Sequence, residues 1–270
     1  MAITTLDGVI AGMQWPRQFG KAVTPTLVAG KPQTLWGLAG NPGAGSYDVT
    51  LAGVALSSTA GQVNGQINFT NPASGNSYLA RLQAMATIPG TLVLADRLWH
   101  NGGFNAANNG VQTINSAAFP ARDNNGSTNG EGVLLALELS NAAGAAAPTI
   151  TIGYTNSAGT PSRSAANYVP TANSPATGSM FPIGLMAGDI GVRSVQNLQL
   201  SVSWVSGTMN LVAYRPLAFL ELTGANVPNA IDALTSGFPR MFDGSVPFLF
   251  FIPSTTTASN IIGQAVWTQG

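Results

Sequence analysis

Apolar and polar residues alternate along much of the chain, most clearly within residues 191–222. Alternation with a period of two predicts a β-strand that buries one face. The apolar positions in the first half of this stretch are Leu198, Leu200, Val202 and Trp204. Alternation resumes at Met209 after a short break that contains Gly207, so we predict a hairpin with its turn at residues 206–208. Pro216 has no N–H for strand pairing and marks the end of the second arm.

The same kind of pattern predicts further strands elsewhere. They cover residues 47–51, 62–69, 78–86, 91–95, 132–139, 149–154, 248–252 and 261–267. Residues 78–86 also fit a helical stripe, but the turn signal at Pro89 and Gly90 leads straight into the next strand, which favours a strand and a second hairpin. A third hairpin is predicted to join residues 132–139 to 149–154. Residues 228–234 fit one short helix, with Asn226 as its N-cap.

These elements predict an all-β fold, because many short strands are separated by turn signals at intervals of about 8–12 residues. We expect a β-sandwich of jelly-roll type over residues 46–270. Residues 1–45 show little periodicity and are interrupted by prolines, so we expect an irregular N-terminal arm or first layer there. Residues 101–130, which are rich in Asn and Gly, and residues 155–179 are expected to form surface loops.

The low content of charged residues limits the partners that the chain can bind. Only 7% of the residues are charged, and the ten basic residues balance the ten acidic ones. Such a chain has no overall field to attract nucleic acid or an anionic membrane, so we expect no direct nucleic-acid or membrane partner. Weak self-repulsion suits a protein that packs against neighbours in an assembly.

The remaining composition limits location and stabilising chemistry. The chain has no cysteine, which excludes disulfides and thiolate metal sites. Its start lacks the basic and apolar regions of a secretory signal, so we expect synthesis in a cytoplasm. The longest run of bulky apolar residues, 248–252, is far too short for a spanning helix.

No catalytic, cofactor-binding or metal-ligating residues are predicted, and we expect no enzyme activity. The carboxylates are spread singly along the chain, and no Gly-x-Ser-x-Gly motif accompanies the single histidine, His100. We therefore expect His100 to be structural. Lys21 and Lys31 lie outside any phosphate-binding motif. Residues 123–131 offer many oxygen atoms but lack the Gly and Glu that a calcium loop needs at positions 128 and 134.

Four segments carry a family resemblance, namely residues 4–12, 94–101, 118–130 and 187–196. In these segments the chain resembles virion structural proteins of tailed bacteriophages. The resemblance implies a part of a phage particle and assigns no catalytic residue. Because the chain is all-β and poor in charge, it looks more like a capsid cement or decoration protein than a portal or scaffold, which are mostly helical.

The leading hypothesis is a non-enzymatic virion protein that forms a homo-oligomer, a trimer being one option, and locks onto the major capsid protein. Exposed strand edges or the N-terminal arm could add a strand to a neighbour. Candidate partner contacts are Trp15, Pro16 and Phe19, because bulky apolar groups in an irregular segment need a surface to pack on. The competing interpretation is that they pack on their own domain.

Two other functions stay open. The first is a tail or fibre module that recognises a host glycan through residues 101–130 and 155–179, although no trimer-forming repeats or coiled-coil stalk support it. The second is a hydrolase of cell-wall or capsular sugar, which would need a carboxylate pair that only the fold could bring together.

Overall fold

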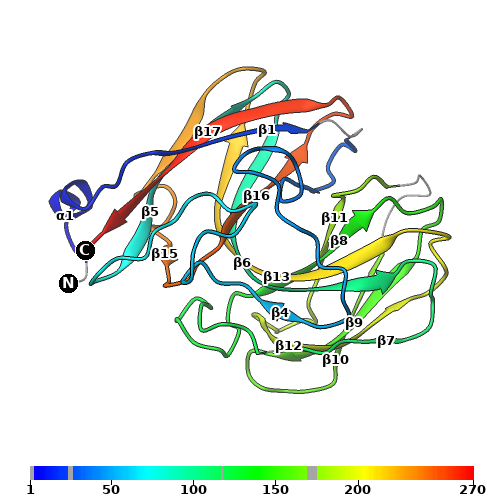
Figure 1. Ribbon diagram of the computed structural model, residues 1–270. Coiled ribbons are helices and arrows are strands. Elements are labelled where there is room, and N and C mark those ends of the chain that lie inside the picture. The colour runs from blue at the N-terminus through cyan, green and yellow to red at the C-terminus, as the bar shows by residue number, and fades with distance from the viewer. Residues whose placement is uncertain (1–2, 24–26, 117, 169–174) are drawn as a thin grey trace. The chain divides into compact units, whose positions relative to one another are not determined.

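The computed structural model describes residues 3–23, 27–116, 118–168 and 175–270. It contains one short helix, and all of its sheets are antiparallel (Figure 1). The elements are α1 (Leu6–Ala11), β1 (Arg17–Val23), β2 (Gln33–Thr34), β3 (Gly40–Asn41), β4 (Val54–Ala55), β5 (Ser77–Ala86), β6 (Gly90–Asn105), β7 (Gln112–Thr113), β8 (Leu134–Asn141), β9 (Thr149–Asn156), β10 (Arg163–Tyr168), β11 (Met180–Ile183), β12 (Val192–Leu200), β13 (Thr208–Leu222), β14 (Asn229–Asp232), β15 (Arg240–Met241), β16 (Pro247–Pro253) and β17 (Ser259–Gln269).

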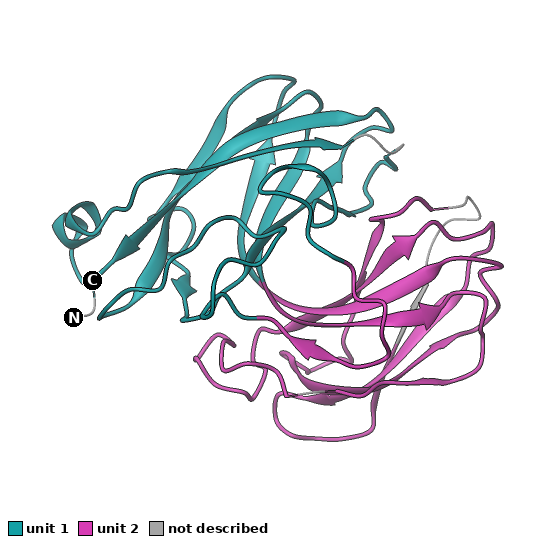
Figure 2. Ribbon diagram, viewed as in Figure 1, with its two compact units in different colours: residues 1–46, 57–96, 216–270 teal, residues 47–56, 97–215 magenta. Residues whose placement is uncertain are grey.

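The chain forms two compact units (Figure 2). Unit 1 contains residues 1–46, 57–96 and 216–270, and unit 2 contains residues 47–56 and 97–215. The long strands β6 and β13 each contribute residues to both units. This grouping does not coincide with the predicted division into residues 1–45 and 46–270, because β1 pairs with β17 along its whole length inside unit 1.

Unit 2 has the strand order of a jelly roll. Its first four strands pair with its last four in nested fashion, as β6 with β13, β7 with β12, β8 with β11 and β9 with β10. The resulting sheets have the orders β6-β13-β8-β11 and β7-β12-β9-β10. Two four-stranded sheets built from such a folded ribbon define the jelly-roll sandwich.

Unit 1 repeats the scheme. Here β1 pairs with β17, β2 with β16, β5 with β14 and β6 with β13. The sheets have the orders β1-β17-β5-β14 and β2-β16-β6-β13, and β3 and β15 add short pairings to β1 and β5. Nested pairing therefore runs through the whole chain, and the predicted jelly-roll β-sandwich is confirmed in both units.

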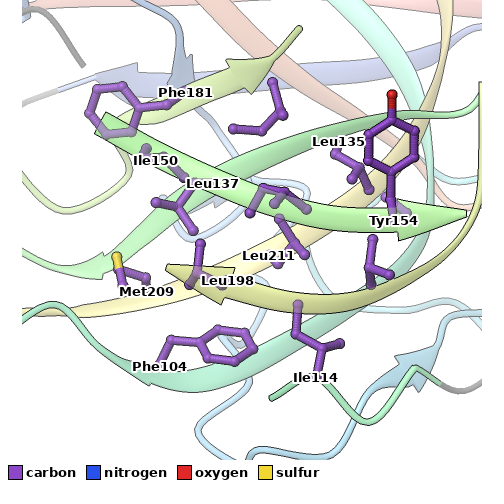
Figure 3. Packing of buried hydrophobic residues seen from close by; sticks show 14 of the residues in the cluster. Phe104, Ile114, Leu135, Leu137, Ile150, Tyr154, Phe181, Leu198, Met209 and Leu211 are labelled. Carbon is purple, nitrogen blue, oxygen red and sulfur yellow. The ribbon is translucent and has the colours of Figure 1, made fainter. Parts of the chain in front are cut away.

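Each unit buries an apolar core between its two sheets. In unit 2, Leu135, Leu137 and Leu211 from one sheet meet Ile150 and Leu198 from the other (Figure 3). The core of unit 1 contains Phe19, Leu82, Leu94, Phe251 and Trp267. Because successive side chains of a strand point to opposite faces, every second residue along these strands points into a core.

The three predicted hairpins are wrong. β5 and β6 lie in different sheets, and the same holds for β8 and β9 and for β12 and β13. In a jelly roll most consecutive strands cross between the sheets, so a short connection does not imply pairing. The strand predicted to reach Trp204 ends at Leu200, and Trp204 lies in the crossing loop, buried against Phe181.

Other local predictions also need correction. Residues 228–234 form no helix, because β14 pairs with β5 and the Asp232 carboxylate accepts hydrogen bonds from the backbone of the following turn. Residues 47–51 and 62–69 form loops, not strands, and side-chain bonds such as that from the Thr50 N–H to Asp48 hold them. Helix α1 was not predicted, whereas the strands at residues 78–86, 248–252 and 261–267 are confirmed.

Lys21 is the buried cation of unit 1. Its side chain is almost fully buried, and Nζ donates hydrogen bonds to the carbonyl oxygens of Leu38 (2.6 Å) and Pro42 (2.5 Å). The lysine thereby ties β1 to the segment around β3. Burial lowers the pKa of Lys21 from 10.5 to about 8.

We predict that Lys21→Met destabilises the fold and changes its response to pH. Two part-buried carbonyls lose their donor, which should cost about 1–3 kcal/mol of the free energy of unfolding. Between pH 8 and 10 the unfolded wild-type chain holds a proton that folded Lys21 has released, so wild-type stability should rise with pH. Urea unfolding at pH 7, 8, 9 and 10 measures both effects.

The variant should lose that rise, whereas Lys31→Met should keep most of it because Lys31 is only half-buried. Equal slopes of stability against pH for wild type and Lys21→Met would contradict the assignment.

Candidate interaction surface

Helix α1 is short and firmly capped. The Thr5 hydroxyl accepts a hydrogen bond from the Gly8 N–H (3.1 Å), and Asp7 places a negative charge in the first turn, where it is favourable. The helix ends at Gly12, where a Cβ would collide with the carbonyl oxygen of Gln269. No helix among the described residues is long and apolar enough to cross a membrane.

The helix covers one end of the outer face of the β17–β5 sheet in unit 1 (Figure 1). Val9 packs against Ala80 of β5 and Val266 of β17, and the Thr268 hydroxyl donates to the Val9 carbonyl oxygen (2.8 Å). The Gln269 N–H also donates to the carbonyl oxygen of Gly12 (3.0 Å), so one buried side chain and two hydrogen bonds fix the helix and its C-cap to the sheet. Its other large side chains do not join this contact.

Apolar side chains gather on the exposed side of this segment. Leu6 and Ile10, one turn apart on α1, are 62% and 58% exposed, and Met13 follows them at the surface. Trp15 is 84% exposed. We call Leu6, Ile10, Met13 and Trp15 the N-terminal apolar surface. Large apolar groups clustered in solvent are typical of an interaction site.

The structure separates the three predicted contact residues. Trp15 and Pro16 are exposed, whereas Phe19 is only 2% exposed and belongs to the core of unit 1. Phe19 is therefore placed as the competing interpretation expects. Leu6 and Ile10 were missed, although their spacing of four residues is the sequence signal of a shared helix face.

Next to this surface the same sheet carries a groove of about 530 Å³. Its walls include Gln18 and Gly20 of β1, Met85 of β5 and Ile262 of β17, and no charged residue lines it. Gly20 contributes to the hollow, because a Cβ there would have no neighbour within 4 Å. The groove is therefore uncharged, and the exposed Arg81 of β5, which pairs with Val266, lies between it and the helix contact.

A buried polar cluster surrounds His100 in unit 2. Arg97 forms a fully buried ion pair with Glu138, with nitrogen–oxygen distances of 2.8 and 3.1 Å. The Arg97 guanidinium also lies 3.3 Å from Nδ1 of His100. Burial, together with the positive charge of Arg97, lowers the pKa of His100 to about 3, so the imidazole is neutral and accepts from Arg97.

Asp96 does not join His100. Its carboxylate accepts hydrogen bonds from the Ser245 hydroxyl (2.9 Å) and the Val246 N–H (2.8 Å) in unit 1. Within the described residues no carboxylate or hydroxyl group is hydrogen-bonded to the imidazole. His100 thus lies beside a buried ion pair, and its one side-chain hydrogen bond within the described residues is that with Arg97.

The oxygen-rich loop at residues 123–131 is organised around one carboxylate. Asp123 accepts hydrogen bonds from the backbone N–H groups of Asn125, Ser127, Gly130 and Glu131 and from the Ser127 hydroxyl. Burial opposes ionisation, but these hydrogen bonds prevail and lower the pKa of Asp123. The chain's own donors occupy this carboxylate, and no group of three potential metal ligands occurs among the described residues.

Comparisons with known proteins give little. No family model matches, and no curated protein matches. The chain is similar to the infectious bursal disease virus VP2 subviral particle (12% identity, 100% of this chain and 84% of that chain, TM-score 0.21). It is similar to T=1 particles derived from the same virus (12%, 96% and 79%, TM-score 0.20). These are viral capsid proteins, but such scores carry no argument, and the fold assignment rests on strand pairing.

We predict that Glu138→Leu is severely destabilising. It leaves the Arg97 guanidinium buried without its carboxylate, which should cost about 3–5 kcal/mol. The double variant Arg97→Met/Glu138→Leu removes both charges and should recover at least half of that loss. Urea unfolding of the wild type, both single variants and the double variant gives the coupling free energy. A loss below about 1 kcal/mol in Glu138→Leu would show that the pair does not hold unit 2 together.

Proposed function

We propose that this protein is a non-enzymatic virion component that self-associates and binds to a capsid shell. The observation that carries the proposal is the N-terminal apolar surface, an exposed apolar cluster on a chain that has only 7% charged residues. Two nested jelly-roll sandwiches support it, since jelly rolls are a common architecture of capsid proteins. The resemblance of four sequence segments to tailed-phage virion proteins points the same way.

Within a particle we favour the role of a cement or decoration protein, with the major capsid protein and further copies of this chain as partners. Stable interfaces bury about 800 Å² per partner, more than four side chains supply. The N-terminal apolar surface would therefore be the centre of a larger contact, where most binding energy concentrates. The four side chains of that surface carry no charge, and Asp7 is the one charged residue of α1, so attachment should depend only weakly on salt.

Cryo-EM of purified particles tests the role directly. Density for this chain on the outside of the shell, at the junctions between capsomers, would support the cement role. Density confined to the tail or its tip would overturn that role and favour the alternative, a receptor-binding tail or fibre module. Detection of the chain only in the infected cell, and in no particle, would overturn the virion proposal itself.

We predict that Leu6→Ser/Ile10→Ser weakens attachment to shells lacking this protein at least tenfold. Both side chains are exposed, so the free energy of unfolding should change by less than about 0.5 kcal/mol. The matched control is Val49→Ser, which removes an 81% exposed apolar side chain in unit 2. Co-sedimentation with shells measures attachment.

Equal attachment of the wild type and the α1 double variant would exclude the N-terminal apolar surface as the contact. Substitutions are sharper than removal of residues 1–20, because that deletion would also take Phe19 out of the core of unit 1.

A further inference from the structure

A second hollow in unit 1 differs in chemistry from the uncharged groove. It has a volume of about 500 Å³, and its walls come from residues 16–18, 41–43 and 62–68. The lining includes Gln18, five further Asn and Gln side chains and Arg17. It includes no carboxylate. We call it the amide cleft. Its size is that of a small-ligand site.

One wall of the amide cleft is held in place by its own hydrogen bonds. The Gln62 side chain donates to the Phe69 carbonyl oxygen (2.6 Å) and accepts from the Phe69 N–H (3.0 Å) and from Gln66 (2.5 Å). Gln66 accepts in turn from the Val63 N–H (3.0 Å). These bonds explain why residues 62–69 form a fixed loop in place of the predicted strand. A wall fixed in advance loses little entropy when a ligand binds.

Four other polar side chains of the cleft are free to bind a ligand, whereas the Asn41 side chain donates to the Gln18 carbonyl oxygen (2.9 Å). The side chains of Gln18, Asn64 and Asn68 make no hydrogen bond to any described residue, and each offers one carbonyl acceptor and one NH2 donor. Arg17 forms no ion pair within the described chain, and its Nε is buried without a partner. Arg17 as a whole is half-buried, and a guanidinium without a carboxylate partner can bind an acidic ligand through its terminal NH2 groups.

We propose that the amide cleft binds an oligosaccharide that carries a carboxylate. Sugar hydroxyls donate and accept at once, which matches side-chain amides, and a carboxylate matches the planar guanidinium of Arg17. Trp15 directly precedes lining residue Pro16, and its exposed ring offers a face for the apolar side of a sugar. A peptide fits less well, because the neighbouring edge strand β3 has only two residues for strand addition.

This inference does not rest on attachment to a shell. It also differs from the earlier glycan hypothesis, which placed recognition at residues 101–130 and 155–179. Glycan binding at the amide cleft and shell attachment through the N-terminal apolar surface use different side chains, apart from Trp15. Each can therefore fail without the other.

An NMR titration of the full chain tests the proposal. The probes are tetragalacturonate, hyaluronan tetrasaccharide and sialyllactose, with cellotetraose, lactose and sodium acetate as controls at equal ionic strength. We expect at least one acidic probe to shift the side-chain signals of Arg17, Asn64 and Asn68, with a dissociation constant below about 1 mM, a modest affinity for one site. The neutral sugars and acetate should bind at least tenfold more weakly.

Three variants locate the binding site. Arg17→Gln should weaken binding at least tenfold, and Asn64→Ala at least fivefold. The Asn64→Ala variant should fold, because Asn64 lies in an exposed loop. The control Arg81→Gln removes an exposed arginine of β5 that does not line the cleft and should bind like the wild type. Three results would overturn the proposal: no shift with any acidic probe up to 10 mM, equal shifts with acetate, or equal weakening by Arg81→Gln.

Discussion

The pairing of β6 with β13 is the constraint on which both sandwiches depend. Each strand starts in one unit and ends in the other, so each lines two cores in turn. β6 is buried at nearly every position from Leu92 to Phe104, so both of its faces are covered, and its polar residues Asp96, Arg97 and Asn101 are buried too. The other nested pairings run from β9·β10, the innermost in chain order, to β1·β17, the outermost.

Strand existence could be predicted from this sequence, but strand partners could not. Periodicity reports which residues face a core, and it identified the strands later seen as β5, β16 and β17. It carries no information about which sheet a strand joins, so a short turn such as Pro89-Gly90 was mistaken for a hairpin. Loops 47–51 and 62–69 alternate as well, yet side chains such as Asp48 and Gln62 bond to nearby backbone and compete with strand pairing.

The edges of the sheets bear on how copies of this chain could associate. The outer strands β2, β3 and β7 have two residues each, β11 and β14 have four, and β10 has six. Short edges leave few unpaired backbone groups, which limits strand addition between molecules. Association by side chains is then the better route, and with 7% charged residues the chain has few charges to keep neighbours apart.

The sequence predicted the candidate contact residues only in part, because it does not show which apolar side chains face the core. Trp15 and Phe19 are similar bulky groups four residues apart, but β1 begins between them, and its register turns Phe19 inward. Hydrophobicity alone cannot decide such a case, because it is the same for a core residue and a contact residue. The amide cleft could not be predicted from the sequence, because its polar groups come from three separate segments that only the folded unit brings together. Such a site is defined by the donors and acceptors that have no hydrogen-bond partner in the folded protein. A sequence pattern does not show which groups these are.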